Sequence, residues 1–520
     1  MAEHGLRKVI ITITVISAAI IELIDTSIVN VALNDMSGNL GATLEDVAWV
    51  VTAYAIANVI IIPMTSFLAA RFGRRNYYIG SILLFTGASV ACGNAHNIWE
   101  LVGFRFLQGI GGGALLSTSQ AILFETFTVA QRGFASSLFA VGLFVGPTIG
   151  PTIGGWIIDN HSWPWIFYIN LPIGLTAAFL AWVYVREPDH ARHAETIDWV
   201  GISLLVVGLG SLQTVLERGE TEDWFSKPYI VALTAVAAVA LVSFVVWELV
   251  TDHPVVELRV LKSRSLAIAA CLTFVTGFML FATVFIVPVF TQRLLGYTAM
   301  QTGMLFLPGV LVALLFLPLM GRILMKGFPP QYMVIGGFAI VACFALQLST
   351  FNLSTGSPDF FWPIIWRALG LSLVTIPLIQ LAVSGLKPRD IPQGVALNNM
   401  MRQMGGSFGV AFINTYLDHR YAAHRMDLVS RLAPGDPATE GRIAQFTQLL
   451  LAKGATLLEA PHKAMALLEG AVQRQAFLLS YLDAYRLVGF LSLACVPLVL
   501  FVGSKKTMSK AAAAAAAESH

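Results

Sequence analysis

Long runs of apolar residues, separated by short polar segments, recur along most of the 520-residue chain. Most of these runs reach about 18 residues or more, which lets a helix cross a hydrocarbon core of roughly 30 Å. The runs are solid rather than alternating in polarity, which disfavours a transmembrane β-barrel. The pattern therefore predicts an all-α polytopic membrane protein with fourteen transmembrane helices. The expected spans cover residues of about 9–33, 47–69, 76–93, 98–122, 134–158, 164–185, 198–216, 229–248, 266–290, 301–324, 332–351, 361–384, 400–417 and 485–503.

The composition agrees with this pattern and removes several classes of function. The chain is 56% hydrophobic and only 12% charged, whereas an ordinary soluble domain carries about 25% charged residues. Its 32 Lys and Arg residues nearly balance 30 Asp and Glu residues, so the net charge gives no indication of nucleic-acid binding. The four cysteines all lie in apolar runs without metal-ligand spacing. Neither a disulfide framework nor a metal site is expected.

Positive charge is distributed unevenly between the short loops on the two sides of the expected bundle. With the N-terminus placed in the cytoplasm, most Lys and Arg residues, Arg402 among them, fall on the cytoplasmic side. The opposite short loops hold only Arg218, Lys227 and Arg293. Because cytoplasmic loops carry the excess of Lys and Arg, and the number of spans is even, both termini are expected in the cytoplasm. Residues 505–520 would form an alanine-rich cytoplasmic tail that is either native or left by cloning.

Four ionisable residues are predicted within the membrane spans. Glu22 and Asp25 lie three residues apart in the first span and therefore share one helix face. Arg105 in the fourth span and Arg367 in the twelfth each lie about six residues inside, at roughly the depth of Asp25. Charged groups inside a membrane normally face the bundle interior and mark ion pathways. Alternatively, Arg105 extends its side chain to the membrane interface.

The fifth span carries glycines at four-residue intervals, interrupted by prolines. Its small and cyclic residues are Gly142, Gly146, Pro147, Gly150, Pro151, Gly154 and Gly155. Such a stripe gives a smooth helix face for the close approach of a neighbour, and the prolines weaken the backbone hydrogen-bond ladder. Plain small-residue packing explains the glycines equally well. The sequence Gly405-x-Ser407-x-Gly409 formally fits a hydrolase elbow, but no strand precedes it, so we interpret it as helix packing.

A basic cytoplasmic loop follows the second span. It reads Ser66-Phe-Leu-Ala-Ala70-Arg71-Phe-Gly73-Arg74-Arg75. Gly73 allows a tight turn, and the arginines can pair with carboxylates or with helix C-termini on this face. Arg132, in the next cytoplasmic loop, is assigned to the same gating group. The alternative is a basic loop that only sets the topology.

These motifs together resemble those of the major facilitator superfamily. The basic loop is similar to its G-x-L-A-D-R-x-G-R-R motif, residues 105–109 to R-x-x-Q-G, and residues 146–155 to the exporter motif G-x-x-x-G-P-x-x-G-G. Residues 22–34 resemble the signature E-x-L-D-x-T-I-x-N-V-A-L-P of fourteen-span drug:proton antiporters. The matches run from about residue 15 to 310 and are most similar to EmrB-type multidrug exporters. In the basic loop Ala70 replaces the family's aspartate and Ser66 its glycine, so the acidic half of the usual charge relay is missing.

The resemblance implies the major facilitator fold, in which two six-helix halves rock about a central cavity. Residues 1–186 would form the N-terminal half, 187–262 an inserted pair of helices with flanking loops, and 263–504 the C-terminal half. An extracytoplasmic segment within that last half, residues 418–484, shows two helical patterns in its sequence. Two amphipathic helices, extending the flanking spans outward or packing on each other, fit this segment better than disorder.

The same resemblance implies a proton-driven antiporter that exports amphipathic or hydrophobic drugs and toxic compounds across the bacterial inner membrane. The proton motive force would drive export without a cofactor. The chain has no G-x-x-x-x-G-K-[ST] sequence, which argues against nucleotide hydrolysis. EmrB-type exporters work with a periplasmic adaptor and an outer-membrane channel, so such partners are implied as well.

Two other classes of function are alternatives for a chain with this sequence. One is an obligate export-complex subunit that hands a specific cargo, such as a fatty acid or a siderophore-like metabolite, to an adaptor. The other is a membrane enzyme or a channel, which is disfavoured because catalytic and filter residues are lacking. Proton-dependent efflux by the isolated chain would separate an exporter from an obligate subunit.

The candidate site residues follow from the motifs and the charges. Asp25 is expected to be the proton-coupling group, Arg105 its counter-charge and Glu22 an auxiliary or substrate-facing acid. The substrate-cavity candidates are Glu22, Asn30, Gln108, Arg367 and Gln380. The gating and structural candidates are Arg71, Gly73, Arg74, Arg75, Arg132, Gly146, Gly150, Pro151, Gly154 and Gly155. Two carboxylates would balance two arginines inside the membrane, and Arg367 would lack an acidic partner in its own half.

Overall fold

The computed structural model describes residues 5–128, 131–187, 197–384, 386–387, 390–432 and 436–500. The expected tail, residues 505–520, lies outside this part of the chain. The regular secondary structure of the described residues is helical throughout. The long helices are α1 (Gly5–Leu40), α2 (Leu44–Phe72), α3 (Arg74–Gly93), α4 (Ile98–Thr126), α5 (Arg132–Asn160), α7 (Asn170–Tyr184), α8 (Trp199–Arg218), α9 (Pro228–Val250), α10 (Arg264–Arg293), α11 (Ala299–Met325), α12 (Pro330–Leu348), α13 (Phe361–Val383), α14 (Ile391–Ser430), α15 (Pro437–Ala452) and α16 (Glu459–Leu500). The short ones are α6 (Trp165–Tyr168) and the 3-10 helices η2 (Trp224–Ser226), η3 (Leu258–Lys262) and η4 (Ser357–Phe360).

The helices supply the fourteen expected membrane spans. Helices α1 to α5 form the first five, α6 with α7 the sixth, α8 to α14 the next seven and α16 the last. In the described residues, 11 helical segments are long and apolar enough to cross a membrane by hydropathy alone. Helices α3, α4 and α14 are less apolar because polar side chains occupy their buried faces, as Arg105 and Gln108 do in α4. The all-α, fourteen-span fold class is confirmed.

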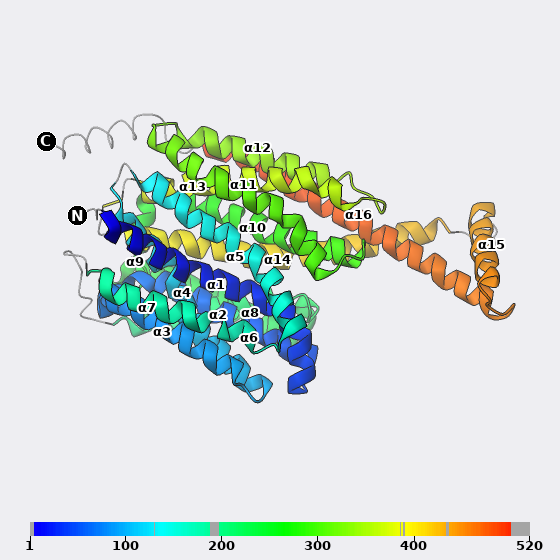
Figure 1. Ribbon diagram of the computed structural model, residues 1–520, viewed down its shortest axis with the longest axis horizontal. Helices are drawn as coiled ribbons and strands as arrows, with labels where there is room; N and C mark the ends of the chain where they lie inside the picture. Colours follow the sequence, from blue (N-terminus) through cyan, green and yellow to red (C-terminus); the bar gives the residue numbers. More distant parts are fainter. Residues whose placement is uncertain are drawn as a thin grey trace.

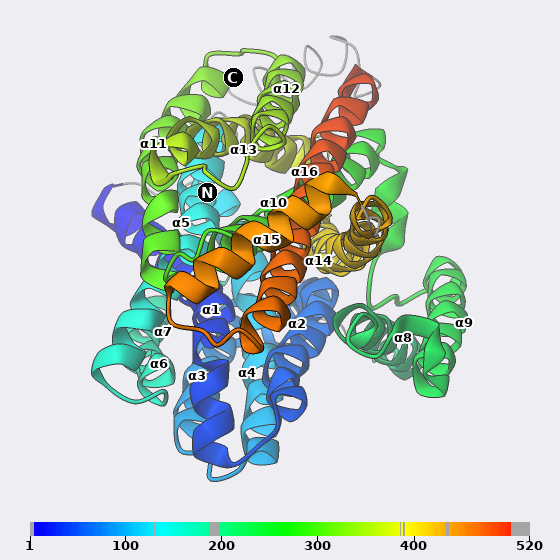
Figure 2. The same cartoon turned by 90° about the vertical axis from the view of Figure 1, so that its right-hand side faces the viewer.

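The two halves lie side by side, with the inserted helices at one edge. Figure 1 shows α1 to α4 with α6 and α7 on one side of the bundle, α11 to α13 with α16 on the other, and α5, α10 and α14 between them. The halves meet where α5 packs against α11 and where α2 and α4 pack against α14. Helix α8 packs against both α2 and α14, and Figure 2 shows it with α9 at the periphery. The start of α1 lies at the end of the molecule opposite to α15 (Figure 1). We call the end that carries the start of α1 and residues 71–75 the basic face.

The last two expected spans are longer than the apolar runs predicted. Helix α14 covers Ile391–Ser430 instead of 400–417, and α16 covers Glu459–Leu500 instead of 485–503. An apolar run ends where the membrane ends, whereas a helix continues as long as its residues favour helical geometry. The polar ends of both helices therefore project from the bundle, and α15 lies across their tips (Figure 1). We call residues 418–484, which comprise these ends and α15, the platform.

Ion pairs hold the two projecting helices of the platform together. Asp483 of α16 accepts a hydrogen bond from Arg420 Nε of α14 at 2.6 Å, and the Nε2 atom of His424 lies 2.8 Å from the same carboxylate oxygen. Further out, Arg425 Nη2 lies 2.7 Å from Glu469 Oε1. The segment is therefore an ordered extension of the two flanking spans, which is one of the arrangements expected from its sequence.

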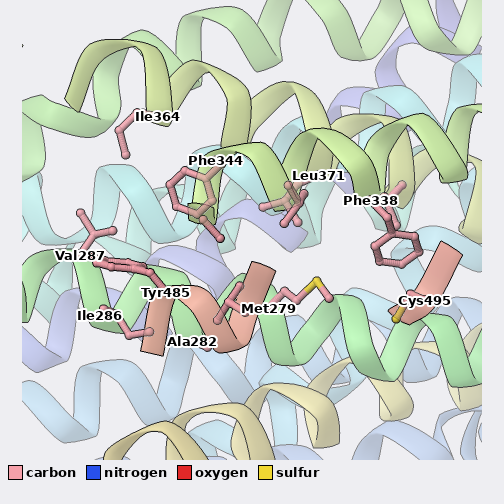
Figure 3. Packing of buried hydrophobic residues seen from close by; sticks show 14 of the residues in the cluster. Met279, Ala282, Ile286, Val287, Phe338, Phe344, Ile364, Leu371, Tyr485 and Cys495 are labelled. Carbon is pink, nitrogen blue, oxygen red and sulfur yellow. The ribbon is translucent and has the colours of Figure 1, made fainter. Parts of the chain in front are cut away.

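Aromatic and aliphatic side chains from α10 to α14 and α16, joined by two residues of α5, form the core of the C-terminal half. Figure 3 shows its labelled members, which are Met279, Ala282, Ile286 and Val287 of α10, Phe338 and Phe344 of α12, Ile364 and Leu371 of α13, and Tyr485 and Cys495 of α16. Lipid is as apolar as these side chains, so close packing rather than removal from water stabilises their contacts. Helix α16 is thus packed into the C-terminal half, and so the platform is anchored to that half.

Glycine faces bring the first and fifth helices of each half together. A Cβ atom on Gly154 of α5 would lie 2.7 Å from Ile28 Cγ1 of α1, and one on Gly409 of α14 would lie 2.7 Å from Phe278 O of α10. Neither position has room for a side chain. The same packing therefore recurs in both halves, and the interpretation of residues 405–409 as helix packing is confirmed.

Candidate functional site

An ion pair between Asp25 of α1 and Arg105 of α4 lies inside the N-terminal half. Arg105 Nη1 is 2.6 Å from Asp25 Oδ2, and the two side chains are 1% and 0% exposed. Helix α4 begins after Asn97, whose side chain accepts a hydrogen bond from Glu100 N at 2.9 Å. This cap sets the start of the helix and so places Arg105 about two turns inside it. The side chain of Arg105 points into the bundle instead of extending to the interface.

Neutral polar side chains complete the surroundings of the Asp25 carboxylate. Gln108 Nε2 of α4 and Asn170 Nδ2 of α7 each donate a hydrogen bond to Asp25 Oδ1 at 2.8 Å. The hydroxyl oxygen of Ser89 on α3 accepts hydrogen bonds from the same two amides, at 3.0 Å and 2.8 Å. Gln108, expected as a cavity residue, is therefore part of the buried charge cluster. All of these partners of Asp25 belong to the N-terminal half.

Arg105 has partners beyond Asp25. Its Nε donates to Val50 O at 3.2 Å, and its Nη1 donates to Gln108 Oε1 at 2.7 Å. The guanidinium carbon lies 4.2 Å from the ring centroid of Tyr54, which is cation–π distance. A buried ion pair is stable only if good geometry and further hydrogen bonds offset the loss of hydration. This pair has both, so a change in the charge of Asp25 disturbs a whole network.

Glu22 lies one helical turn before Asp25 and has different partners. Its Oε1 accepts hydrogen bonds from Asn58 Nδ2 at 3.0 Å and from Tyr54 OH at 3.4 Å, both on α2. Its Oε2 is buried and has no hydrogen-bond partner among the described residues. The buried Arg402 of α14 interacts electrostatically with this carboxylate. The two acids of α1 therefore share one buried region, and Glu22 interacts in addition with a cation of the C-terminal half.

Arg402, expected on the cytoplasmic side at the start of the span 400–417, lies deeper than predicted. Helix α14 begins at Ile391, ahead of the apolar run, and Arg402 is buried within it. Arg402 is thus a third buried arginine beside Arg105 and Arg367, and the predicted balance of two acids and two arginines is wrong as well. One turn earlier, Asn399 donates to Gln120 Oε1 of α4 at 2.9 Å and to Ser117 Oγ at 3.3 Å. This stretch of α14 thus contacts the N-terminal half directly.

Arg367 has the position in α13 that Arg105 has in α4, but its partner is neutral. Its Nε donates to Thr283 Oγ1 of α10 at 2.9 Å, and its guanidinium carbon lies 5.5 Å from the ring centroid of Phe306. Thr283 lies on the first helix of the C-terminal half, as Asp25 does in the N-terminal half. In the described residues no carboxylate forms an ion pair with Arg367, as the sequence suggested.

Two other cavity candidates lie apart from these clusters. Asn30 is exposed on α1, about two turns beyond Glu22. Gln380 lies near the basic face, where its Nε2 is 2.5 Å from the position that a Cβ on Gly133 of α5 would take. The structure therefore places Asn30 at a surface and Gln380 at the contact between the halves.

The basic loop finds its acidic partners elsewhere in the chain. Gly73 has a φ of 81°, a value that favours glycine, and separates α2 from α3. The Glu187 carboxylate, beyond α7, accepts hydrogen bonds from the backbone N–H groups of Arg74 at 2.6 Å and of Arg75 at 3.0 Å. The Arg74 side chain forms an ion pair with Glu125 at the end of α4. The charge relay therefore has an acidic half, although its motif lacks the usual aspartate.

The remaining arginines among the gating candidates lie on the same face. Arg71 is exposed in the last turn of α2. Arg75 of α3 donates a side-chain hydrogen bond to the carbonyl oxygen of Trp182 in α7. Arg132 is the first residue of α5 and interacts electrostatically with Glu125 of α4. These contacts connect α3 with α7 and α4 with α5.

Removal of the Glu187 carboxylate is expected to destabilise the basic face. Glu187→Ala leaves two backbone N–H groups of α3 without their acceptor, which by analogy with lost helix caps costs about 0.5–2 kcal/mol. Glu187→Gln keeps an oxygen acceptor and should lose less. Thermal unfolding of the purified protein in detergent measures both, and Asp35→Ala, which removes an exposed carboxylate from α1, is the matched control. An unfolding temperature of Glu187→Ala equal to that of the control would show that this cap contributes nothing.

Comparison with protein families decides the class of this chain. A family model described as Major Facilitator Superfamily matches residues 15–410. The chain belongs to this superfamily. Its membership makes the chain a multi-pass membrane transporter and not an enzyme.

Curated relatives of similar length place the chain within the superfamily. The Multidrug export protein EmrB of Escherichia coli (strain K12) is 33% identical over 447 residues, which are 86% of this chain and 87% of the relative. The Fatty acid resistance protein FarB of Neisseria gonorrhoeae is 31% identical over 490 residues, which are 94% of this chain and 95% of the relative. The resemblance to EmrB-type members of the superfamily is therefore confirmed.

Solved structures of the superfamily show the same fold at low sequence identity. The proton:xylose symporter XylE, bound to 6-bromo-6-deoxy-D-glucose, aligns with a TM-score of 0.56 at 14% identity and covers 95% of this chain and 96% of its own. The human organic anion transporter MFSD10 aligns with a TM-score of 0.57 at 12% identity and covers 93% of this chain and 99% of its own. These structures support the superfamily fold and carry no argument about substrate.

Proposed function

We propose that the protein is a proton-driven antiporter that exports amphipathic or hydrophobic compounds across a bacterial inner membrane. The Asp25–Arg105 ion pair carries this proposal, because charges buried inside a membrane mark ion pathways. The name of the relative EmrB, a multidrug export protein, supports export and a broad substrate range. In this orientation the basic face and both termini are cytoplasmic, as the distribution of Lys and Arg predicts. The platform then projects from the opposite side.

A proton can act on this site by changing what the Asp25 carboxylate accepts. The ionised carboxylate takes hydrogen bonds from Arg105 on one oxygen and from Gln108 and Asn170 on the other. A proton on either oxygen adds a donor where a donor already points. At least one partner must then turn or withdraw, and the attraction for Arg105 falls. The charge of Asp25 is in this way linked to the position of α1 relative to α4 and α7.

We place the substrate site at a small cavity between the halves, which has room for about one water molecule and would have to widen to admit a drug-sized compound. It is bounded by α5, α10, α13 and α14, and its lining residues include Phe144, Thr276, Leu280, Ile379, Asn398 and Arg402. Most of this lining is apolar with a few polar groups, which is the composition of multispecific ligand sites. The five cavity candidates drawn from the sequence are not among the lining residues. We therefore assign substrate contact to Asn398 and Arg402 in their place.

A second candidate function is the export of a specific cargo, such as a fatty acid, that the chain hands to an adaptor. The similarity to FarB, a fatty acid resistance protein, favours it, as does the buried arginine, whose charge suits a carboxylate, in the lining of the cavity. The two candidates differ in whether the isolated chain transports by itself and in what it accepts.

Transport by purified protein in liposomes tests the proposal and separates the candidates. With a pH gradient imposed, the chain alone should accumulate a lipophilic dye such as ethidium against its concentration gradient. Accumulation should stop when an ionophore collapses the pH gradient. Transport of laurate but not of the dye, and only after addition of an adaptor, would favour the second candidate instead. Equal accumulation of the dye with and without the pH gradient would exclude proton-driven antiport.

We propose further that the platform binds a periplasmic adaptor, which connects the chain to an outer-membrane channel. Leu457 and Leu458, between α15 and α16, are 82% and 81% exposed, and Leu449 of α15 is 50% exposed. Exposed apolar groups gathered on one surface of a protein mark an interaction site. Their place at the end of two long helices puts them far from the membrane.

Shortening the platform is expected to abolish drug resistance in cells while leaving transport in liposomes intact. Replacement of residues 431–464 by a flexible linker removes the exposed leucines but retains the ion pair of Arg425 with Glu469. Co-purification of the adaptor from membranes should be lost in parallel. The double variant Leu457→Ser and Leu458→Ser separates apolar docking from platform length. Adaptor capture that survives both changes would contradict this assignment.

A further inference from the structure

The buried charges of the membrane region are divided unevenly between the two halves. Asp25 is held by Arg105, Gln108 and Asn170, all of which lie on helices of the N-terminal half. When the halves rock as rigid bodies, the distances between Asp25 and these partners do not change. A proton can favour one conformation only if it interacts differently with the two. Protonation of Asp25 therefore needs a link to the other half.

Glu22 is the acid that interacts with a cation of the other half. Its Oε1 is occupied by Asn58 and Tyr54 of α2, but its buried Oε2 has no hydrogen-bond partner in the described part of the chain. That cation is Arg402, which is buried on α14 of the C-terminal half. Because the two groups belong to different halves, their separation changes whenever the halves move.

Contacts beside Arg402 show that α14 is docked on the N-terminal half at this level. Asn399 donates to Gln120 and Ser117 of α4 at 2.9 Å and 3.3 Å. Arg402 itself is buried, its Nε has no partner among the described residues, and it lines the cavity between the halves. Its charge is therefore not consumed by an ion pair within its own half. It remains available to the carboxylate across the interface.

We propose that Arg402 is the counter-charge in the C-terminal half that converts the protonation state of the α1 acids into movement of the halves. Attraction between Arg402 and ionised Glu22 holds α14 against the N-terminal half, where it packs on α2 and α4, and protonation of Glu22 removes this attraction. Arg402 is a positioning residue, since it acts through Glu22 and not on the transported proton directly. The inference rests on the proton-driven transport proposed above and deepens it.

Tyr54 connects this interface with the Asp25 site. Its hydroxyl donates to Glu22, and its ring lies under the guanidinium of Arg105. The titratable and charged groups that face Glu22 are thus Asp25 on its own helix, Tyr54 on α2 and Arg402 on α14. Helix α4 presents Gly112 to it, and the glycines of α5 lie against the face of α1 that carries Leu23 and Ile28. Because Glu22 lies one helical turn from Asp25, a change in the charge of Asp25 changes the electrostatic potential at Glu22.

Distance measurements between the halves test this assignment. Spin labels on Asn39→Cys of α1 and Thr350→Cys after α12, both at exposed positions, report the separation of the halves on the platform side. The four native cysteines are free and are replaced first. In the otherwise unchanged protein the distance distribution should shift between acidic and alkaline pH. Arg402→Gln should lose most of this shift, whereas Arg402→Lys should retain a large part of it.

Two comparisons make the result specific to Arg402. Arg367→Gln removes another buried arginine from the same half, one that bonds Thr283 and no carboxylate in the described residues, and should keep the full shift. Glu22→Gln should keep the distance distribution as it is at acidic pH, and adding Arg402→Gln should change nothing further.

A full pH-dependent shift in Arg402→Gln, or no shift in the unchanged protein, would overturn the inference. Uphill transport in liposomes by Arg402→Gln at the unchanged rate would overturn it as well, while leaving proton-driven export intact. Lack of such transport in the unchanged protein would instead overturn the proposed function.

Discussion

Asp25→Asn is expected to abolish uphill, pH-gradient-driven efflux while the protein still inserts and binds substrate. The amide retains the shape and polarity of the carboxylate but cannot be titrated. It also leaves Arg105 buried without its counter-charge, although Val50 O and Gln108 Oε1 still accept from that side chain. Breaking a buried ion pair in this way costs about 3–5 kcal/mol in soluble proteins. The variant must therefore be shown to be monodisperse and to bind substrate before its transport is measured.

Proton release on addition of substrate to purified protein is the decisive measurement for Asp25. The unchanged protein should release protons, Asp25→Asn should not, and substrate binding by the variant should no longer depend on pH. Asp35→Asn, at an exposed position two to three turns along the same helix, is the matched control and should behave like the unchanged protein. If Asp25→Asn still releases protons while Glu22→Gln does not, the two acids have exchanged roles.

Gly150→Leu is expected to block transport without preventing insertion into the membrane. A Cβ atom at this position of α5 would clash with the Ser27 hydroxyl and would lie 3.1 Å from Ile24 O, both on α1. A leucine must therefore push α5 away from the helix that carries both acids. Overpacking of this kind costs about 1–3 kcal/mol, and it misplaces Glu22 and Asp25 relative to their partners on α2 and α4.

Gly155→Leu supplies a control on the same helix. A Cβ at Gly155 meets no atom within 4 Å, so this variant adds the same bulk where there is space for it. Liposome transport should be near normal in Gly155→Leu and absent in Gly150→Leu, with Gly150→Ala between them. Normal transport by Gly150→Leu would show that close packing at this glycine of the antiporter motif is not needed for transport.

The spans and the Asp25–Arg105 pair were predictable because their signals are local. A run of apolar residues reports burial in lipid directly, and an acid and an arginine at equal depth in neighbouring spans have few alternatives to pairing. Arg402 was misplaced for the same reason. Asn398, Asn399 and Arg402 interrupt the apolar run at the start of α14, so the run suggested the cytoplasmic end of a span where the helix is buried against protein and not against lipid. The signal that was present is helical spacing, because Val395, Asn399, Arg402, Gly406 and Gly409 recur at intervals of three or four residues.

The partners of the basic loop could not be predicted from the motif. A motif specifies residues near one another in sequence, whereas Glu187 lies 113 positions from Arg74. The loss of the aspartate at position 70 suggested a broken relay, and only the three-dimensional arrangement shows which carboxylates replace it. The same limit applies to the neutral surroundings of Asp25. The spacing of residues does not show that Asn170 donates to this carboxylate, or that Ser89 accepts from the two amides that do.

The continuity of α14 has a mechanical consequence. Arg402 and the tip of the platform at Ser430 lie on one unbroken helix, about 42 Å apart at 1.5 Å per residue. A rigid rod pivoting near its inner end magnifies small rotations, so a tilt of roughly ten degrees would sweep the tip through about 7 Å. A partner seated on the platform would be driven back and forth once per transport cycle. The proposed complex with an adaptor would therefore need a compliant joint or a sliding contact at that seat.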